Sequence, residues 1–396
     1  MNECRTGWEK HDLGEVVTHK KGFAFKSEKY LQAGVRIIRI SDTTRDSIHN
    51  EHPVFWAENE AENFKEYRLN ENDIVLSTVG SRPHLPQSMV GKAIRVPRDA
   101  AGSLLNQNLV KLIPKASKIT NQYLYEILKN RRFISYLSAL VRGNANQVSI
   151  SLSDIFSFRF VLPPLPEQKK IAQILSIWDK AITATQRLLE NSQQRKKGLM
   201  QQLLTGKKRL PGFEGEWENS ILTNHCSVVT GNKDLQNKVE DGEYPFFVRS
   251  DNIERIDSYS FEGEAILIPG DGRVGEIFHY INGKFDFHQR VYKLSDFEGA
   301  QGLFIYYYLK RFFKAEVTKN SVKATVDSLR MPVFTGMRIK LPSLVEQQSI
   351  VDVLSCSDRE VQAITRQLNL LKEQKKALMQ QLLTGKRRVK VETEAA

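Results

Sequence analysis

One short segment has the spacing of a dinucleotide-binding site. Gly270–Gly275, with the sequence GDGRVG, fits the pattern G-x-G-x-x-G. In a dinucleotide-binding protein this pattern follows a strand and opens a helix. A strand-like run does precede it, but the residues that follow, EIFHYINGKFDF, are typical of a second strand that turns at Asn282-Gly283, a hairpin signal. A tight β-turn is therefore the better interpretation of the glycine motif.

The other residue types that support catalysis or metal binding do not form a site. The segment LLTGKK at Leu203–Lys208 lacks the upstream glycine of a phosphate-binding loop and follows a predicted helix. The eight histidines and three cysteines show no metal-ligand spacing. We find neither the Asn/Asp-Pro-Pro-aromatic motif of adenine methyltransferases nor a nuclease-like group of acids and lysine. The sequence thus predicts no catalytic residue, no metal site and no cofactor in this chain.

Charge is more informative than any single motif. Across 396 residues, 58 lysines and arginines oppose 46 acids, which leaves a net charge of +12. Such a balance favours a polyanionic partner, although simple solubility would also account for it. No lipidation signal, long basic amphipathic helix or apolar run of membrane length is present, so nucleic acid is preferred over a membrane. The N-terminus lacks the apolar core of a signal peptide, and we expect a cytoplasmic location.

Polar loops in both halves of the chain carry groups that suit DNA. Base edges require side chains with paired donors and acceptors, and phosphates require lysine and arginine. For each single residue, an ordinary solvated turn is the alternative. In the first half the candidates for base edges are Arg82, His84, Gln107, Asn144, Asn146 and Gln147, and those for phosphates are Lys20, Lys21 and Arg142. In the second half the candidates are Arg249, Asn252, Arg273, His288, Gln289, Arg290, Lys319 and Lys323.

The elements that must position these loops are marked by an internal repeat. MQQLLTGK occurs at Met200–Lys207 and again at Met379–Lys386. LPPLPEQKKIAQIL at Leu162–Leu175 resembles LPSLVEQQSIVDVL at Leu341–Leu354, at the same separation of 179 residues. No gap is needed across either copy. A repeat of this length predicts two similar halves and not a solenoid.

Each copy predicts one long helix. A strand-like run that ends at a proline precedes the helix, and a glutamate lies in the first turn of the helix. A Thr-Gly pair, which suits a left-handed cap, ends the helix. Apolar residues recur in alternating steps of four and three, the seam of a coiled coil. Roughly 38 residues would span on the order of 57 Å, which suggests a paired spacer. The seam comprises Ile171, Leu175, Trp178, Ile182, Leu189, Leu199, Leu203, Ile350, Leu354, Val361, Ile364, Leu368, Leu371, Leu378 and Leu382.

Two lysines, Lys196 and Lys375, also fall on this seam. They either set the register of the helices or extend their ammonium groups to solvent; the second alternative is the commoner one.

The regions outside the repeat predict two β-rich bodies. Short strand-like runs such as Val35–Ser41 and Ala265–Gly270 are broken by glycine, asparagine and aspartate. The two regions also resemble each other weakly: NQNLVKLIP from Asn106 parallels HQRVYKLSD from His288. The fold class is therefore α+β, with a short amphipathic helix in each body.

At this point the chain resembles the specificity subunits of type I restriction–modification systems. The resemblance rests on the two helix openings (LPPLPEQ and LPSLVEQ), the paired LMQQLLTGK ends, LPGF at Leu210–Phe213 and GEYPFFVRSDNI at Gly242–Ile253. It implies two target recognition domains, each recognising half of a split double-stranded DNA sequence. It also implies an antiparallel coiled coil that separates them with pseudo-two-fold symmetry and binds two methyltransferase subunits. Those subunits, and two motor–nuclease subunits where present, would hold S-adenosylmethionine, ATP and Mg²⁺.

On this basis we expect a first recognition domain at 1–161, a first helix at 162–207, a second recognition domain at 208–340, a second helix at 341–390 and a tail at 391–396. The favoured function is a non-catalytic, sequence-specific DNA-recognition subunit for a bipartite, asymmetric target. One alternative is a self-contained duplicated DNA-modifying or DNA-cleaving enzyme with an unrecognised active site. Another is a scaffold that joins two protein partners and binds no DNA.

Overall fold

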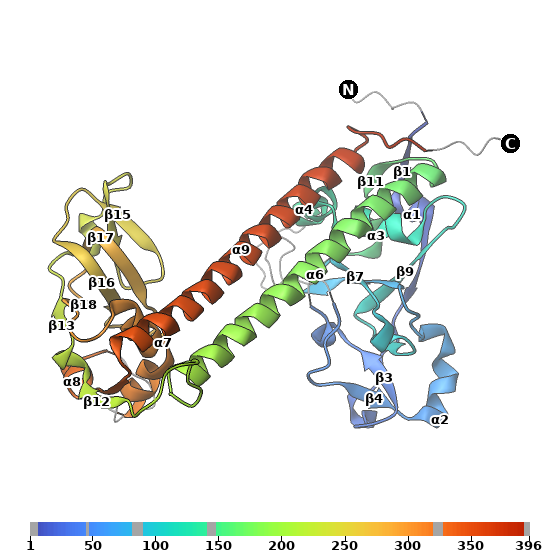
Figure 1. Cartoon of the computed structure of the whole chain (residues 1–396). Coiled ribbons are helices and arrows are strands. Elements are labelled where there is room, and N and C mark those ends of the chain that lie inside the picture. Colours follow the sequence, from blue (N-terminus) through green and yellow to red (C-terminus); the bar gives the residue numbers. More distant parts are fainter. Residues whose placement is uncertain (1–6, 45–46, 81–89, 141–147, 320–327, 392–396) are drawn as a thin grey trace. The chain divides into compact units, whose positions relative to one another are not determined.

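The computed structural model describes residues 7–44, 47–80, 90–140, 148–319 and 328–391 (Figure 1). The chain divides into two compact units, which are described separately below. Unit 1 consists of Met1–Ala184 and Leu368–Ala396, and unit 2 of Thr185–Gln367. Each unit thus contains one β-rich body and one half of each long helix.

Besides two short strand pairs, unit 1 contains two larger sheets that pack around apolar cores. A four-stranded sheet has the order β2-β9-β5-β7, and a three-stranded sheet has the order β4-β3-β8. The strands of these sheets are β2 (Val17–Lys21), β3 (Val35–Ile38), β4 (Val54–Trp56), β5 (Ile74–Ser77), β7 (Ala93–Arg95), β8 (Leu104–Leu105) and β9 (Leu109–Pro114). Outside the sheets lie β1 (Glu9–Asp12), which pairs with β11 (Arg159–Leu162), and the helices α1 (Leu13–Val16), α2 (Glu58–Ala61), α3 (Asn121–Lys129), α4 (Arg131–Leu140) and α5 (Leu152–Phe156).

Unit 2 contains a single six-stranded sheet with the order β13-β18-β16-β17-β14-β15. Its strands are β13 (Ser227–Thr230), β14 (Tyr244–Phe247), β15 (Ile253–Ile256), β16 (Phe261–Pro269), β17 (His279–Phe287) and β18 (Val291–Ser295). Beside the sheet lie the pair β12 (Glu218–Ile221) and β19 (Arg338–Leu341) and the helices α7 (Gly302–Lys319) and α8 (Met331–Thr335).

The two bodies share one strand order. In unit 1 the antiparallel series β2-β9-β5-β7 corresponds to β13-β18-β16-β17 in unit 2, and the parallel pair β8-β3 corresponds to β17-β14. The single long strand β17 therefore occupies the place of both β7 and β8. The weak sequence similarity between the halves reflects a duplicated fold.

The predicted hairpin at Asn282-Gly283 is wrong. Strand β17 continues through these residues, and Gly283 pairs directly with Gly263 of β16. Both glycines have positive φ, 151° and 141°, which distorts the ladder locally without reversing the chain. The chain instead reverses at residues 270–278, which contain the GDGRVG motif; a strand and not a helix follows, so the dinucleotide-binding interpretation is excluded.

The two copies of the repeat form helices of equal length. Helix α6 (Leu165–Leu203) and helix α9 (Leu344–Leu382) each contain 39 residues. Both end as the Thr-Gly pairs predict: Gly206 and Gly385 have φ of 67° and 64° and donate backbone hydrogen bonds to the carbonyls of Leu203 and Leu382. The sequence thus specifies both helix ends.

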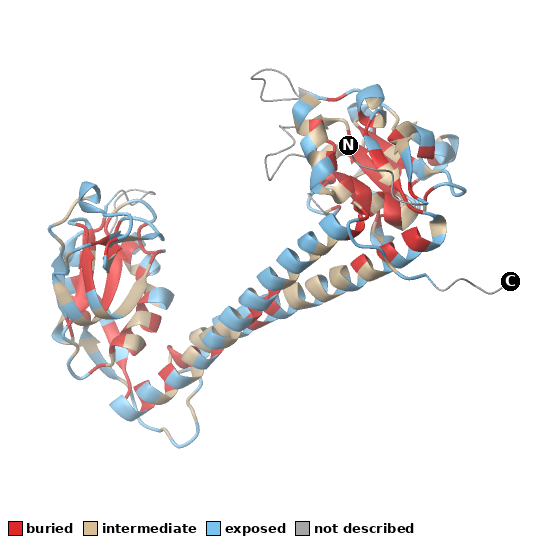
Figure 2. Ribbon diagram, turned by 90° about the horizontal axis from the view of Figure 1, so that it is seen from above, coloured by how far each residue is buried: buried red, intermediate tan, exposed pale blue. Residues whose placement is uncertain are grey.

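The helices pair in an antiparallel manner in each unit. The core of unit 1 joins Ile171 and Leu175 of α6 to Leu382 of α9, and the core of unit 2 joins Ile350 and Leu354 of α9 to Leu203 of α6. All fifteen seam residues named above are buried or half-buried. Figure 2 shows buried and intermediate positions along both long helices. In contrast, Ile177 and Leu370, just off the seam, are 61% and 54% exposed.

The seam lysines form ion pairs across the two helices. Lys375 Nζ lies 2.6 Å from Asp179 Oδ1 in unit 1, and Lys196 pairs with Asp358 at the equivalent place in unit 2. Their side chains are only 14% and 16% exposed. The expectation of a free ammonium group in solvent is therefore wrong, and the pairs are suited to fixing the register of the helices.

A buried glutamine attaches each β-rich body to the helices. Gln168 Oε1 accepts the backbone N–H of Thr120, the N-cap residue of α3, at 2.9 Å, and Gln347 Oε1 accepts that of Gln301, which precedes α7, at 2.9 Å. Each glutamine also donates to the carbonyl of the proline five residues before it, at 2.9 Å. Both side chains are fully buried. The body and the helices are thus fastened in the same way in both units.

A glutamate next to each glutamine makes a second attachment, which we call the clasp. Arg209, beyond the end of α6, contacts Glu346 at 2.5 and 2.6 Å, and Arg388, beyond the end of α9, contacts Glu167 at 2.7 and 2.8 Å. Trp8 Nε1 also donates to Glu167 at 3.0 Å. The start of each long helix is therefore bound to the segment that follows the other.

The two units differ at one buried position between the body and the helices. In unit 2, Tyr307 of α7 donates a hydrogen bond to Asp358 Oδ2 at 2.7 Å. In unit 1 the equivalent residue of α3 is Glu126, whose Oε2 lies 3.6 Å from Lys375 Nζ, beyond hydrogen-bond distance. Burial raises the pKa of Glu126, and the charge of Asp179 raises it further, while Lys375 of α9, Arg95 of β7 and Lys129 of α3 lower it.

We expect Glu126→Gln to stabilise the protein at neutral pH. A carboxyl group whose pKa is raised on folding contributes stability below its unfolded pKa and loses it as pH rises through the folded pKa. The variant should therefore match the wild type near pH 4.5 and exceed it by on the order of 1 kcal/mol at pH 8. Urea unfolding at both pH values measures the difference, with Glu51→Gln as an exposed control. An equal difference in the free energy of unfolding at both pH values would show that the ionisation of Glu126 is not the cause.

Candidate nucleic-acid interface

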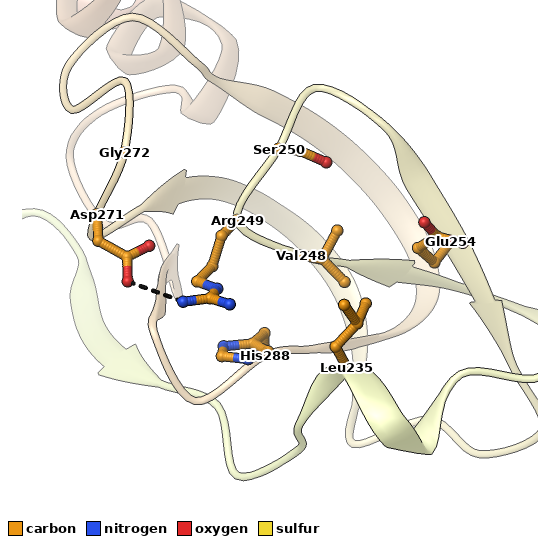
Figure 3. A pocket seen from close by; sticks show the side chains of 8 residues that line it. All are labelled: Leu235, Val248, Arg249, Ser250, Glu254, Asp271, Gly272 and His288. Carbon is orange, nitrogen blue, oxygen red and sulfur yellow. Dashed lines mark hydrogen bonds and ion pairs between the residues drawn. The ribbon is translucent and has the colours of Figure 1, made fainter.

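A shallow pocket in unit 2 lies where β13, β14, β16 and β17 end. It has a volume of about 460 Å³. We call it the recognition pocket; it is lined by Leu235, Val248, Arg249, Ser250, Glu254, Asp271, Gly272 and His288 (Figure 3). These residues come from four separate segments that the sheet brings to one place.

Arginines and carboxylates alternate at this pocket. Arg249 Nη1 lies 3.3 Å from Asp271 Oδ2, and Arg290 Nε lies 4.0 Å from the same atom. Figure 3 shows the guanidinium group of Arg249 directed toward Asp271. Arg249 and Arg290 are exposed, and Glu254 is half-buried. The pocket thus offers both donors and acceptors, as the edges of DNA bases require.

His288 does not present an edge to a ligand. It is only 2% exposed, and its Nδ1 accepts the backbone N–H of Arg290 at 2.9 Å. Burial lowers the pKa of His288, which favours a neutral ring. A neutral ring that accepts at Nδ1 carries its proton on Nε2, which lies 3.7 Å from Asp234 Oδ1. The ring therefore shapes the segment that presents Gln289 and Arg290, and its predicted contact with a base is not supported by this geometry.

Gln289 is exposed beside the same loop. Its Nε2 donates to Asp234 Oδ2 at 2.8 Å, and its backbone N–H donates to the carbonyl of Lys233 at 2.8 Å. The sequence interpretation did not include the loop that carries Lys233 and Asp234. The parallel between the two halves could have located it, because a glycine follows the equivalent strand-like run in each half: Gly22 after Lys20 and Lys21, and Gly231 before Lys233 and Asp234.

The remaining candidates of the second half lie on exposed segments. Asn252 lies in the turn between β14 and β15, and Arg273, in the connection between β16 and β17, pairs with Asp251. Lys319 ends α7 and lies 3.2 Å from Glu316. Lys323 lies outside the described residues. The structure thus gathers Arg249, Gln289 and Arg290 around the recognition pocket and does not place Lys319 among its lining residues.

In the first half, three of the candidates lie within the described residues. Lys20, on β2, pairs with Glu66 and lies 4.6 Å from the centre of the Tyr67 ring, whereas the neighbouring Lys21 is exposed. Gln107 is exposed in the turn between β8 and β9, next to the end of β2. The other candidates, Arg82, His84, Arg142, Asn144, Asn146 and Gln147, lie outside the described residues.

Two further observations concern the described residues alone. Among them, no group of three histidines, cysteines or acids is arranged to hold a metal ion. None of the helices described here combines the length and the apolar character needed to span a membrane.

The described residues thus form two β-rich bodies of one strand order, each attached to the paired helices, with a polar pocket at the strand ends of the second body. A family model described as the type I restriction modification DNA specificity domain matches residues 5–191 and 214–373. The chain therefore belongs to this family, and the resemblance seen in the sequence is confirmed.

Comparisons with individual relatives support this assignment to the family. The type I restriction enzyme MjaVIII specificity subunit of Methanocaldococcus jannaschii is 26% identical over 361 residues, which cover 82% of this chain and 81% of the relative. The crystal structure of the S subunit from M. genitalium matches with a TM-score of 0.67 at 15% identity, covering 97% of this chain and 98% of that one. A structure of the type I restriction–modification system, solved to study complex assembly, matches with a TM-score of 0.58 at 18% identity, covering 98% of this chain and all of that one. These two structures show that the fold is shared.

The protein is accordingly a DNA-recognition subunit of a type I restriction–modification system and not an enzyme in its own right. The alternative of a self-contained duplicated enzyme finds no support in these comparisons.

Proposed function

We propose that the protein recognises a bipartite, asymmetric target in double-stranded DNA, one half with each module, and positions two methyltransferase subunits on it. The observation that carries this proposal is the duplication itself: two bodies of one strand order are fastened to paired helices by equivalent glutamine and glutamate contacts. Because each body is attached to the helices in the same way, the two attachments present equivalent surfaces, which suit two copies of one partner protein.

The two modules present different side chains on the same frame. Arg249 and Asp271 line the recognition pocket of the second module, whereas the described candidates of the first module are lysines of β2 and Gln107. Different side chains at base edges select different bases, so the two half-sites differ. S-adenosylmethionine, ATP and Mg²⁺ then belong to the methyltransferase subunits and to motor–nuclease subunits where these are present, in the cytoplasm.

An exchange of modules tests this function. Replacing residues 208–340 with the corresponding module of another family member should change one half-site and leave the other unchanged, because each body has its own core. The chimaera is expressed with the methyltransferase of its own system, and methylated adenines are mapped genome-wide by single-molecule sequencing. The reciprocal exchange of 1–161 is the matched control. A change in both half-sites from a single exchange would contradict independent recognition.

A further inference from the structure

A second concave surface of unit 2 lies beside the recognition pocket, and no candidate named so far lines it. Its volume is about 540 Å³. We call it the basic pocket; it is lined by Gly275, Glu276 and Phe278 from the connection between β16 and β17 and by Lys310, Arg311, Lys314, Ala315 and Thr318 from α7.

The basic pocket carries three cations and one acid. Lys314 Nζ lies 2.5 Å from Glu276 Oε1, so this pair is formed already. Lys310 Nζ donates to the hydroxyl of Tyr306 at 3.2 Å, and the Arg311 guanidinium lies 5.1 Å from the centre of the Phe312 ring. Among the described residues, neither Lys310 nor Arg311 has a carboxylate within ion-pair distance. Both are exposed, and their charges remain available to an anion.

One segment joins this surface to the recognition pocket. Asp271 and Gly272 line the recognition pocket, and Gly275 and Glu276, three and four residues further on, line the basic pocket. Gly275 has a φ of 73°, and a Cβ added there would lie 3.2 Å from Lys314 Cα. The connection is therefore packed closely against α7, and the two pockets are held at a fixed separation.

The two pockets differ in the ligand atoms that they suit. The recognition pocket combines Arg249 with the carboxylates of Glu254 and Asp271, which gives donors and acceptors for base edges. The basic pocket has a net excess of positive charge on exposed side chains, which suits phosphate groups. Lys310 and Lys314 are separated by about 6 Å along α7, one helical turn, so both can face one strand of a duplex.

The first module carries a similar basic cluster at the equivalent place. Helices α3 and α4 follow β9 as α7 follows β18, and Lys129, Arg131 and Arg132 lie where α3 ends and α4 begins. Arg131 and Arg132 are exposed. A feature present in both modules points to a ligand that both modules share, whereas the half-sites that they recognise differ.

We propose that Lys310 and Arg311, beside the Lys314–Glu276 pair, bind phosphate groups of the DNA duplex whose bases the recognition pocket contacts. This inference rests on the proposed function and adds a phosphate-binding site to it. Such contacts fix the position of the module on the duplex and carry no sequence information.

The test measures how DNA binding by the full chain, assembled with its own methyltransferase subunits, depends on salt. Each neutralised phosphate contributes about 0.9 to the slope of log affinity against log salt. The variant Lys310→Gln/Arg311→Gln should lower the slope by roughly 1.8, and Arg311→Gln alone by roughly 0.9. The charge-matched control is Lys284→Gln/Lys340→Gln, two exposed lysines that line neither pocket, and it should keep the wild-type slope.

Two duplexes, the mapped target and the same duplex with the second half-site scrambled, separate the outcomes. Equal loss of affinity for both duplexes supports the proposal. An unchanged slope overturns the proposal, and so does a loss of affinity confined to the target duplex. Loss of assembly with the methyltransferase at an unchanged slope also overturns it, because that result would indicate that the basic pocket binds an acidic protein partner. If the wild type shows neither salt-dependent binding nor preference for the target, the proposed function itself fails.

Discussion

Insertion of four residues into α6 after Glu190 is expected to add one or two unspecified base pairs between the two half-sites of the DNA target. The insertion lengthens the helix by roughly 6 Å, since each residue adds ~1.5 Å. Successive base pairs are roughly 3.4 Å apart along a duplex strand, so the added length corresponds to about two of them. Both half-sites should remain the same, because neither body is altered.

The coiled-coil seam is the reason why we expect four inserted residues to be tolerated. Four residues approximate one helical turn, so the seam positions that follow the insertion, beginning with Ser192, Lys196 and Leu199, keep their direction apart from a local stutter. An insertion of two residues instead rotates the seam positions that follow it by about 200° around the helix axis. That rotation would move Leu199 and Leu203 away from α9 and separate Lys196 from Asp358. We therefore expect the two-residue variant to lose assembly and methylation altogether.

Mapping methylated adenines in cells that carry each variant measures both effects. The four-residue insertion should give the original half-sites at a wider spacing, and the two-residue insertion should give no methylation. An unchanged spacing together with intact methylation in the four-residue variant would show that the paired helices bind partners without setting the distance.

The long helices could be predicted because their determinants are local and periodic. The seam, the Thr-Gly ends and the gap-free repeat all lie within segments of 46 residues, Leu162–Lys207 and Leu341–Lys386. The ion pairs across the helices could not be predicted in the same way. Asp358 is 162 residues from Lys196, and it becomes a neighbour only when the register of the antiparallel pair is known.

The exposure of the candidate residues around the recognition pocket could be predicted in part. The exposed positions of Arg249, Gln289 and Arg290 follow from loops rich in polar residues, whereas the burial of His288 depends on the backbone of β17 and on Asp234 from another segment. The Asn-Gly pair in β17 is a strong hairpin signal when its neighbours are unknown. Seven residues of pairing with β16 outweigh that local preference, which is a tertiary effect.

The clasps give the largest expected change in stability. Arg209→Ala should destabilise unit 2 by about 3–5 kcal/mol, because it leaves the buried carboxylate of Glu346 without its counter-charge. The Glu346 side chain is 1% exposed and loses two charge-assisted hydrogen bonds. Urea unfolding measures the total loss. Hydrogen exchange should increase at the start of α9, while unit 1 serves as an internal reference.

The equivalent clasp of unit 1 provides a graded comparison. Arg388→Ala should cost less than Arg209→Ala, since Glu167 keeps the hydrogen bond from Trp8 Nε1 and Arg388 is already 44% exposed. Lys208→Ala removes one exposed positive charge beside Arg209 and should change the stability by less than about 0.5 kcal/mol. The double variant Arg209→Met/Glu346→Gln should recover most of the loss, because no uncompensated charge then remains buried. Equal losses for Arg209→Ala and Lys208→Ala would show that the clasp contributes only net charge, and the attachment of the second body to the helices would then rest on Gln347 and on the shared apolar core.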